Sequence, residues 1–112
     1  VTVRTMLIAQ AVCGTPAIFG MLVAFIMLFT LQDLEPTIIG FAQVFAAAIA
    51  VGLGGIGPGI GCGHVGETSC EAIAKNPLHD ALMLRTMLIG QAVSQSTAIY
   101  AFIVALVVLF VV

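Results

Sequence analysis

Charged residues are scarce in this sequence. Only 7% of its 112 residues are charged, with three Lys or Arg and five Asp or Glu, whereas 62% are hydrophobic. Soluble domains carry about 25% charged residues, so the composition excludes a globular protein with a water-covered surface. Three bases form no basic patch, and we expect no nucleic-acid partner. We expect a membrane protein that contacts lipid.

Cysteines and catalytic groups are also few. Cys13, Cys62 and Cys70 are odd in number and lack the spacing of metal ligands, which argues against a disulfide framework and a zinc site. We interpret them as small buried side chains. Ser94 and Ser96 have no base at motif distance, so we expect no catalysis by this chain alone and no cofactor.

Long apolar runs dominate the sequence instead. Three of them are long enough to cross about 30 Å of hydrocarbon, which takes about 20 helical residues: Thr5 to Leu31, Thr37 to Gly66 and Ala81 to Val112. No cleavable signal pattern precedes the first run, and because the chain starts without Met we expect further residues upstream of Val1. The sequence predicts an all-α membrane protein with three visible spans.

The few charges predict an orientation. Arg4, Lys75 and Arg85 fall on one side of the membrane if the spans alternate, and the opposite turn at 32–36 has two acids and no base. Cytoplasmic loops of membrane proteins are enriched in Lys and Arg. We therefore expect the side with Arg4 and Lys75 to be cytoplasmic.

The chain contains an internal repeat. A shift of 81 residues places Arg4 on Arg85, and 14 of the 26 positions from Arg4 to Phe29 are then identical. A period of 81 residues that includes two spans is a helical hairpin, so the first and third spans are equivalent. The predicted organisation is an outer helix of an incomplete hairpin at 1–32, a turn at 33–36 and a complete hairpin at 37–112. That hairpin divides into an inner helix at 37–74, a turn at 75–80 and an outer helix at 81–112.

Small residues form two rows on the middle span. One row is Ala47, Ala50, Gly54, Gly57 and Gly61, and the other is Ala48, Gly52, Gly55, Gly59 and Gly63. At 100° per residue the rows lie on different faces, and small residues let membrane helices approach closely. Two such faces suit a helix packed between two like neighbours in a closed ring. Two alternatives are that glycines are simply common in membrane helices and that the run is a phosphate-binding loop. Against the loop, no strand precedes the glycines and no Lys follows them in the Walker position. Pro58 removes one helical hydrogen bond and is expected to bend the span.

Three motifs in the second hairpin occur together. They are Gly57-Pro-Gly-Ile-Gly-Cys-Gly-His64, Glu71-Ala-Ile-Ala-Lys-Asn-Pro77 and the run from Arg85 through Gln91 to Tyr100. This set resembles the c subunit, or proteolipid, of F-type ATP synthase rotor rings, and in particular its sodium-binding branch. The repeat resembles the duplicated hairpins of V-type proteolipids.

The resemblance implies a fold and partners. The glycine-rich helix would form the inner circle of a ring of c subunits, and the turn Lys75-Asn76-Pro77 would meet the central stalk. The expected partners are further copies, the stator a subunit, the central-stalk subunits and lipid, in a bacterial inner membrane. The ring as a whole would carry sodium or protons and couple their flow to ATP synthesis.

The resemblance also implies an ion site that has lost its charge. The sodium-type pattern has a Gln where this chain has Cys62, a carboxylate where it has Gln95, a backbone carbonyl at Val93, a Ser at Ser96 and a Tyr at Tyr100. Gln91 matches the family as well. The first-copy equivalents of Gln95, Ser96 and Tyr100 are Gly14, Thr15 and Phe19, and Pro16 follows Thr15. A Gln has no titratable proton and no net charge, and a thiol is a poor ligand for sodium, so we expect no metal in this hairpin.

Other ionisable residues provide alternatives for the site. His64 and Glu67 lie one turn apart and could handle protons together. Glu71 matches a family position near the turn, and His79 and Asp80 belong to the turn itself. For Glu71, His79 and Asp80 we expect a solvated location.

Three functions are compatible with these observations. The first is a rotor-ring proteolipid whose visible sites lack the carboxylate and which shares its ring with subunits that keep theirs. The second is a structural membrane protein related to the rotor proteolipids that moves no ion. The third is a small channel or transporter of another family, which would require the repeat and the Lys75-Asn76-Pro77 turn to be accidental.

Overall fold

The computed structural model describes residues 1–33 and 37–111, and within these ranges it consists of helices joined by short turns, without a strand. The elements are α1 (Thr2–Cys13), α2 (Thr15–Thr30), α3 (Ile38–Lys75), the single 3₁₀ turn η1 (Pro77–His79) and α4 (Asp80–Phe110). Together α1 and α2, then α3, and then η1 with α4 give three stretches that are long and apolar enough to cross a membrane. The predicted all-α class with three spans is confirmed.

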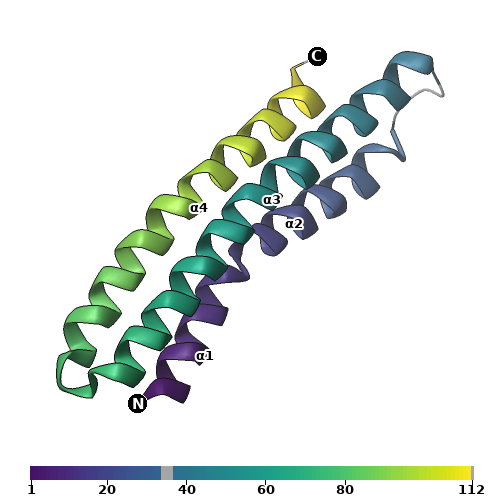
Figure 1. Ribbon diagram of the computed structural model, residues 1–112. Coiled ribbons are helices and arrows are strands. Elements are labelled where there is room, and N and C mark those ends of the chain that lie inside the picture. The colour runs from purple at the N-terminus through teal and green to yellow at the C-terminus, as the bar shows by residue number, and fades with distance from the viewer. Residues whose placement is uncertain (34–36, 112) are drawn as a thin grey trace.

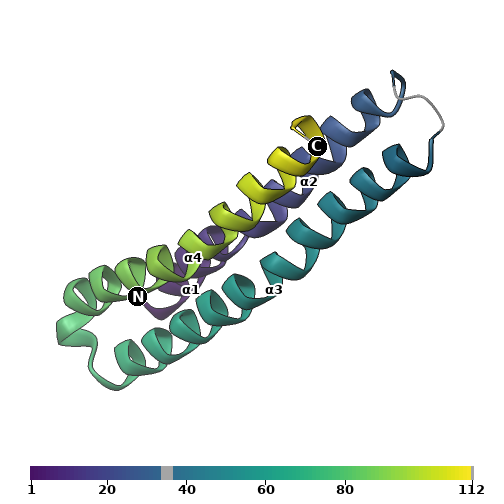
Figure 2. The ribbon, with the colours of Figure 1, turned by 90° about the horizontal axis from the view of Figure 1, so that it is seen from above.

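The three spans lie side by side as an elongated bundle of 61 × 18 × 15 Å. The helices α3 and α4 form an antiparallel hairpin closed by η1, and α1 and α2 follow one another along α3 (Figure 1). The view from above shows α3 on one side of the bundle (Figure 2). Since α1 and α2 also contact α4, the first span packs against both helices of the hairpin.

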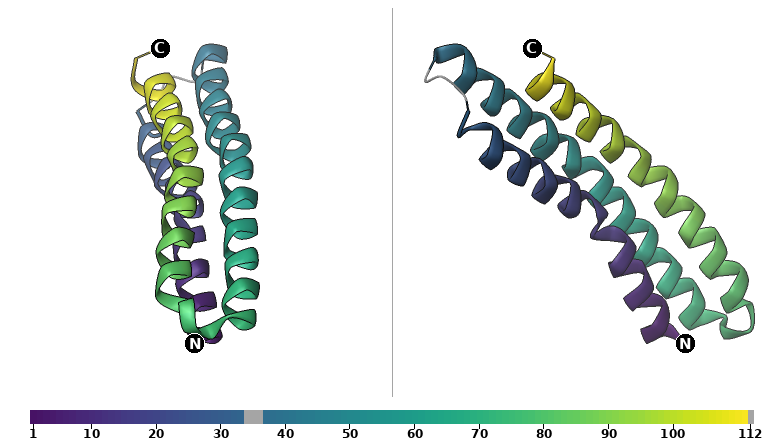
Figure 3. Two further views of the ribbon diagram at one scale, coloured as in Figure 1. Left: turned by 60° about the vertical axis from the view of Figure 1, so that its left-hand side comes forward. Right: turned by 180° about the vertical axis from the view of Figure 1, so that it is seen from behind.

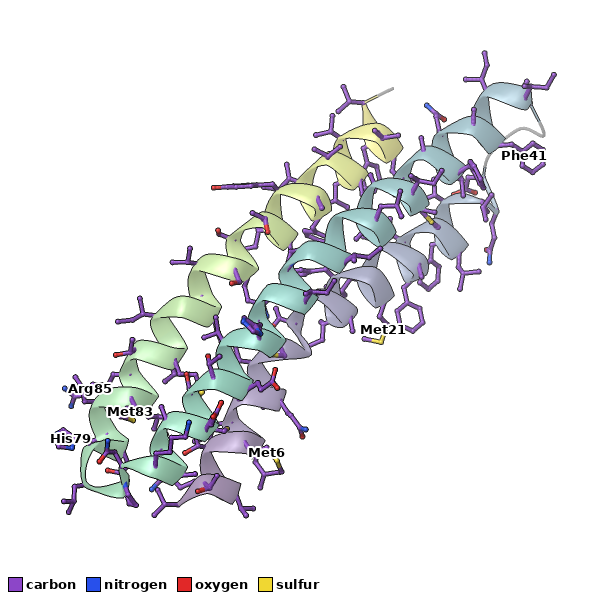
Figure 4. The ribbon with its side chains drawn as sticks, in the orientation of Figure 1. Met6, Met21, Phe41, His79, Met83 and Arg85 are labelled. Atoms are coloured by element: carbon purple, nitrogen blue, oxygen red, sulfur yellow. The ribbon has the colours of Figure 1, made fainter. Side chains whose placement is uncertain are left out.

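The basic residues gather at one end of the bundle. The N-terminus lies beside the turn between α3 and α4, and the C-terminus lies at the far end (Figure 3). Arg85 and His79 project at the turn end (Figure 4), and Arg4 lines a small cavity there with Val1, Thr5, Asp80 and Leu84. The alternation of spans used to group the three bases is therefore present in the fold.

The first span is not the single helix predicted for 1–32. It breaks between Cys13 and Thr15, where Gly14 joins α1 to α2, and the offset between the two helices is visible from behind (Figure 3). The physical reason is Pro16, which lacks a backbone N–H and favours the first turn of a new helix.

The second hairpin differs little from the predicted boundaries. The inner helix runs over Ile38–Lys75 rather than 37–74, and the outer helix over Asp80–Phe110 rather than 81–112. The predicted turn at 33–36 lies outside the described residues except for Asp33. Helix α3 continues through Pro58.

Apolar packing holds the half of the bundle that is remote from η1. There α2, α3 and α4 meet around Val23, Ala47, Ala105 and Leu109, all buried. The rings of Phe19 and Phe102 stack with centroids 5.0 Å apart. This cluster holds α2 against the hairpin, so the first span is fixed in position beyond its break.

The two glycine rows of α3 have different neighbours within the chain. A Cβ at Gly54 would collide with Ala101, and one at Gly61 would lie 3.3 Å from the hydroxyl of Ser94, so the first row packs on α4. In the second row a Cβ at Gly55 would lie 3.8 Å from Pro16, whereas Gly52, Gly59 and Gly63 have open space. Gly54 and Gly61 of the first row therefore have their partner inside the chain, whereas Gly57 of that row and most of the second row face open space.

Most of the outer surface is apolar. Met6, Met21 and Phe41 project away from the bundle (Figure 4) and are 43%, 52% and 64% exposed. Within the most apolar window of each span, only 11 to 22% of the residues are buried inside the chain. The outward side chains are suited to lipid or to neighbouring proteins.

Substitution of Gly54 tests the packing of α3 on α4. The Gly54→Ala change places a methyl group against Ala101, and such overpacking costs about 1–3 kcal/mol. We expect the free energy of unfolding of the purified chain, measured by titration with SDS, to fall by this amount. Gly52→Ala is the matched control, since its methyl group meets open space; equal unfolding midpoints for the two variants would contradict the packing.

Candidate functional site

The polar cluster lies at the middle of α4. Gln95 has fifteen residues of the helix on either side, because α4 runs over Asp80–Phe110, which is about 22 Å to each end. Its side chain is only 7% exposed, and that of Gln91, one turn earlier, is fully buried. Two uncharged amides are therefore buried at or near the midpoint of the third span.

Pro16 creates a hydrogen-bond acceptor at the same depth. In a continuous helix the carbonyl of Val12 would accept from the N–H four residues later, at position 16, but proline has none. Two side chains donate to this carbonyl instead: the Thr15 hydroxyl at 2.8 Å and Gln95 Nε2 at 2.9 Å. The break in the first span is thus satisfied by a residue 83 positions away.

The two amides also contact the inner helix. Gln95 Nε2 lies 3.3 Å from the Cys62 sulfur. Gln91 Nε2 lies 3.3 Å from the Cys62 carbonyl, 3.4 Å from the Ala9 carbonyl and 3.4 Å from the Cys13 sulfur. These contacts join α1, α3 and α4 at one level, so the site lies between the first span and the hairpin.

The amide oxygens have a different environment. Gln91 Oε1 and Gln95 Oε1 are buried and have no hydrogen-bond partner among the described residues. The Gln95 amide directs its N–H, not its oxygen, at the Val12 carbonyl, and the two are joined by a direct hydrogen bond. The cluster is therefore neutral, and its bridge needs no cation.

The structure brings together only some of the residues predicted for the site. Cys62, Gln91 and Gln95 are in contact, whereas Val93 and Tyr100 are 67% and 64% exposed, and Ser96 donates to the Val93 carbonyl at 2.6 Å. Val93 and Gln95 differ by about 200° around a helix. Hence the Val93, Ser96 and Tyr100 positions face away from Cys62 of the same chain.

The first span provides the backbone carbonyl next to Gln95 that was predicted to come from Val93. The repeat equates Val12 with Val93 and Thr15 with Ser96, and both hydroxyls donate to the carbonyl three residues earlier. Phe19 packs on Phe102, and Gly14 is exposed. Prediction from the sequence missed Val12, Ala9 and Cys13 as members of the site. The 81-residue shift, applied to Val93, would have indicated Val12.

The alternative acid–base residues lie away from this cluster. His64 Nδ1 is 3.8 Å from Glu67 Oε2, with both side chains about three-quarters exposed, and Lys75 pairs with Glu71 at 2.6 Å. In the turn, Asn76 and Pro77 are exposed. No group of three or more His, Cys, Asp or Glu residues suited to a metal occurs in the ranges 1–33 and 37–111.

A sequence profile for the ATP synthase C subunit matches residues 45–108. These residues include the glycine rows, the turn and the polar cluster, and they make up more than half of the chain. The chain belongs to the ATP synthase c-subunit family. It is therefore an integral membrane protein.

Individual relatives extend the comparison. The ATP synthase c subunit of Prochlorococcus marinus is 45% identical over 69 residues, which cover 62% of this chain and 85% of the relative. That of Petrotoga mobilis is 39% identical over 69 residues, covering 62% and 72%. The second ATP synthase c subunit of Cereibacter sphaeroides is 36% identical over 77 residues, covering 69% and 93%.

Replacement of Gln91 tests the contribution of the amide cluster to stability. Gln91→Leu removes the donor shared by Ala9, Cys13 and Cys62, and hydrogen bonds between membrane helices contribute about 0.6 kcal/mol and at most about 1.7 kcal/mol each. We expect the free energy of unfolding in SDS titration to fall by about 1–2 kcal/mol.

The matched control for this change is Gln10→Leu. Gln10 is the repeat equivalent of Gln91 but is exposed, so its replacement should leave the unfolding midpoint in place. A loss of stability in Gln10→Leu as large as that in Gln91→Leu would contradict the assignment.

Proposed function

We propose that this chain is a component of the rotor ring of an ion-translocating ATP synthase and that its own described site carries no ion. Membership of the c-subunit family supports the ring. The hydrogen bond from Gln95 Nε2 to the Val12 carbonyl, 2.9 Å long, supports a site that binds no ion. The amide N–H connects the outer helix of one hairpin to that of the next without a positive ion between them.

The physical argument is the difference between an amide and a carboxylate. A carboxylate at this depth would accept a cation or a proton and release it near a stator cation. The Gln95 amide does neither. Each charge missing from the transport cycle removes about 2.3 kcal/mol of coupling per 100 mV of membrane potential. A ring with such sites completes a turn with fewer ions, so fewer ions pass for each ATP.

The exposed face of α4 supports a place among other proteolipid copies. Val12 and Thr15 approach Gln95 from the first span, and Val93 and Ser96 are their repeat equivalents on α4. Val93, Ser96 and Tyr100 are therefore positioned to complete the site of a following hairpin, including one that keeps a carboxylate. Most of the second glycine row remains open for a further inner helix.

The remaining partners in this proposal are the central stalk, the stator a subunit and the transported ion. In this proposal the Lys75-Asn76-Pro77 turn faces the cytoplasm and meets the central stalk, because the basic residues lie at that end. The stator a subunit would face the outer helices. The ring as a whole would carry sodium or protons; sodium is preferred, since Ser96 and Tyr100 resemble the sodium-binding branch.

Restoration of the site tests the proposal. The double change Gln95→Glu and Cys62→Gln supplies the carboxylate and the second oxygen ligand next to the Val12 carbonyl. We expect the new carboxyl group at position 95 in the assembled complex to be labelled by a hydrophobic carbodiimide and to be protected by added sodium. Absence of labelling in a correctly assembled ring would contradict an inherited ion site, and labelling without sodium protection would indicate a proton site.

Both a rotor component with an uncharged site and a purely structural relative are expected to tolerate loss of the Gln95 amide, so the proteolipid composition of the complex separates the two. Gln95→Leu cannot bridge to Val12, but it also introduces no charge. If the ring contains ion-carrying copies, this variant should assemble and synthesise ATP at a rate close to that of the parent. If no other proteolipid is found by mass spectrometry of the purified complex, the chain cannot drive rotation by a carboxylate, and the structural function is supported instead.

A further inference from the structure

Two cysteines from different spans meet inside the polar cluster. The sulfur of Cys13, the last residue of α1, lies 2.7 Å from the sulfur of Cys62 on α3. Both cysteines are free thiols in the structure. A disulfide requires sulfurs about 2.05 Å apart, so the pair needs only a small movement of side chains to bond.

The backbone brings these side chains together. One helical turn from Cys62, a Cβ at Gly66 would lie 3.1 Å from Cβ of Ala9, which is itself one turn from Cys13. The absence of a side chain at Gly66 therefore allows α1 and α3 to approach closely. The sulfurs are further held by amide donors, Gln91 Nε2 at 3.4 Å from Cys13 and Gln95 Nε2 at 3.3 Å from Cys62.

One of the two cysteines lies next to a groove on the surface of the chain. Cys62 is fully buried, but Cys13 lines an open and mostly apolar groove between α1 and α3, with Met6, Gly63 and Cys70. A reagent that enters this groove at membrane depth must be soluble in hydrocarbon, since charged reagents are excluded from it. Lipid-soluble quinones have that property and accept two electrons.

We propose that Cys13 and Cys62 form a redox-active pair that a lipid-soluble quinone oxidises to an intrachain disulfide. The two S–H bonds break and one S–S bond forms. The two electrons and two protons pass to the carbonyl oxygens of the quinone, which becomes the hydroquinone. The bond closes a loop between residues 49 positions apart and fastens the first span to the inner helix, independently of ion transport.

Thiol counting in the intact complex tests the pair. Membranes that contain the assembled enzyme are treated with tetramethyl-benzoquinone, whose fully substituted ring cannot add thiols. The chain is then unfolded in SDS, alkylated with a maleimide and weighed by mass spectrometry. The reduced chain has three cysteines to alkylate. After oxidation we expect a single alkylation, at Cys70, and a loss of about 2 Da for the new bond.

Matched variants identify the bonded residues. Cys70→Ser should lose both remaining thiols on oxidation, whereas Cys13→Ser and Cys62→Ser should keep two thiols with or without the quinone. Retention of all three thiols in the parent, both with the quinone and with the apolar disulfide 2,2′-dithiodipyridine, would overturn the pair. Loss of thiols with 2,2′-dithiodipyridine but not with the quinone would contradict the quinone as the oxidant. A ladder of linked chains on a non-reducing gel would overturn the intrachain connection.

Discussion

The structure depends on one requirement of the membrane interior, namely that a polar group in hydrocarbon must find its partner within the protein. Pro16 leaves the carbonyl of Val12 without its helical donor, within a stretch long and apolar enough to cross a membrane. The Thr15 hydroxyl and the Gln95 amide satisfy it. Because Gln95 belongs to the third span, the second of these donors is available only where that span lies beside the first. The Cys62 side chain contacts the Gln95 amide, and the Gln91 amide contacts the Cys62 carbonyl, at the same level of the bundle.

The internal repeat persists at the level of single hydrogen bonds. Thr15 bonds to Val12 as Ser96 bonds to Val93, although the two hydroxyl residues differ in type. The two copies differ in the other hydrogen-bond donors that these carbonyls receive. That of Val12 has lost its helical donor to Pro16 and takes the Gln95 amide, whereas position 97 keeps its N–H because it is a threonine. The first copy is thus specialised to receive its neighbour in the same chain, while the equivalent face of α4 remains exposed.

Much of the fold was predictable because it follows from composition and periodicity. The apolar runs predicted the three spans. Gly54 and Gly61 of the first row of small residues do pack closely, but against α4 of the same chain, whereas this row was predicted to pack against like neighbours in a ring. The break at Gly14 was not predicted, since proline is tolerated in many membrane helices and its effect depends on the neighbours available. For the site, the resemblance indicated the positions of Cys62, Gln91 and Gln95, and these three residues lie in contact. The part played by Val12 and Cys13 depends on how α1 packs, which no local pattern in the sequence encodes.

The break has a consequence for how the first span enters the membrane. Helix α1 has 12 residues and α2 has 16, about 18 Å and 24 Å long, so neither half alone reaches across about 30 Å of hydrocarbon. The two halves must insert together as one segment. Until the third span lies beside them, the Val12 carbonyl has only the hydroxyl of Thr15. The first span therefore receives its last hydrogen-bond donor from the third.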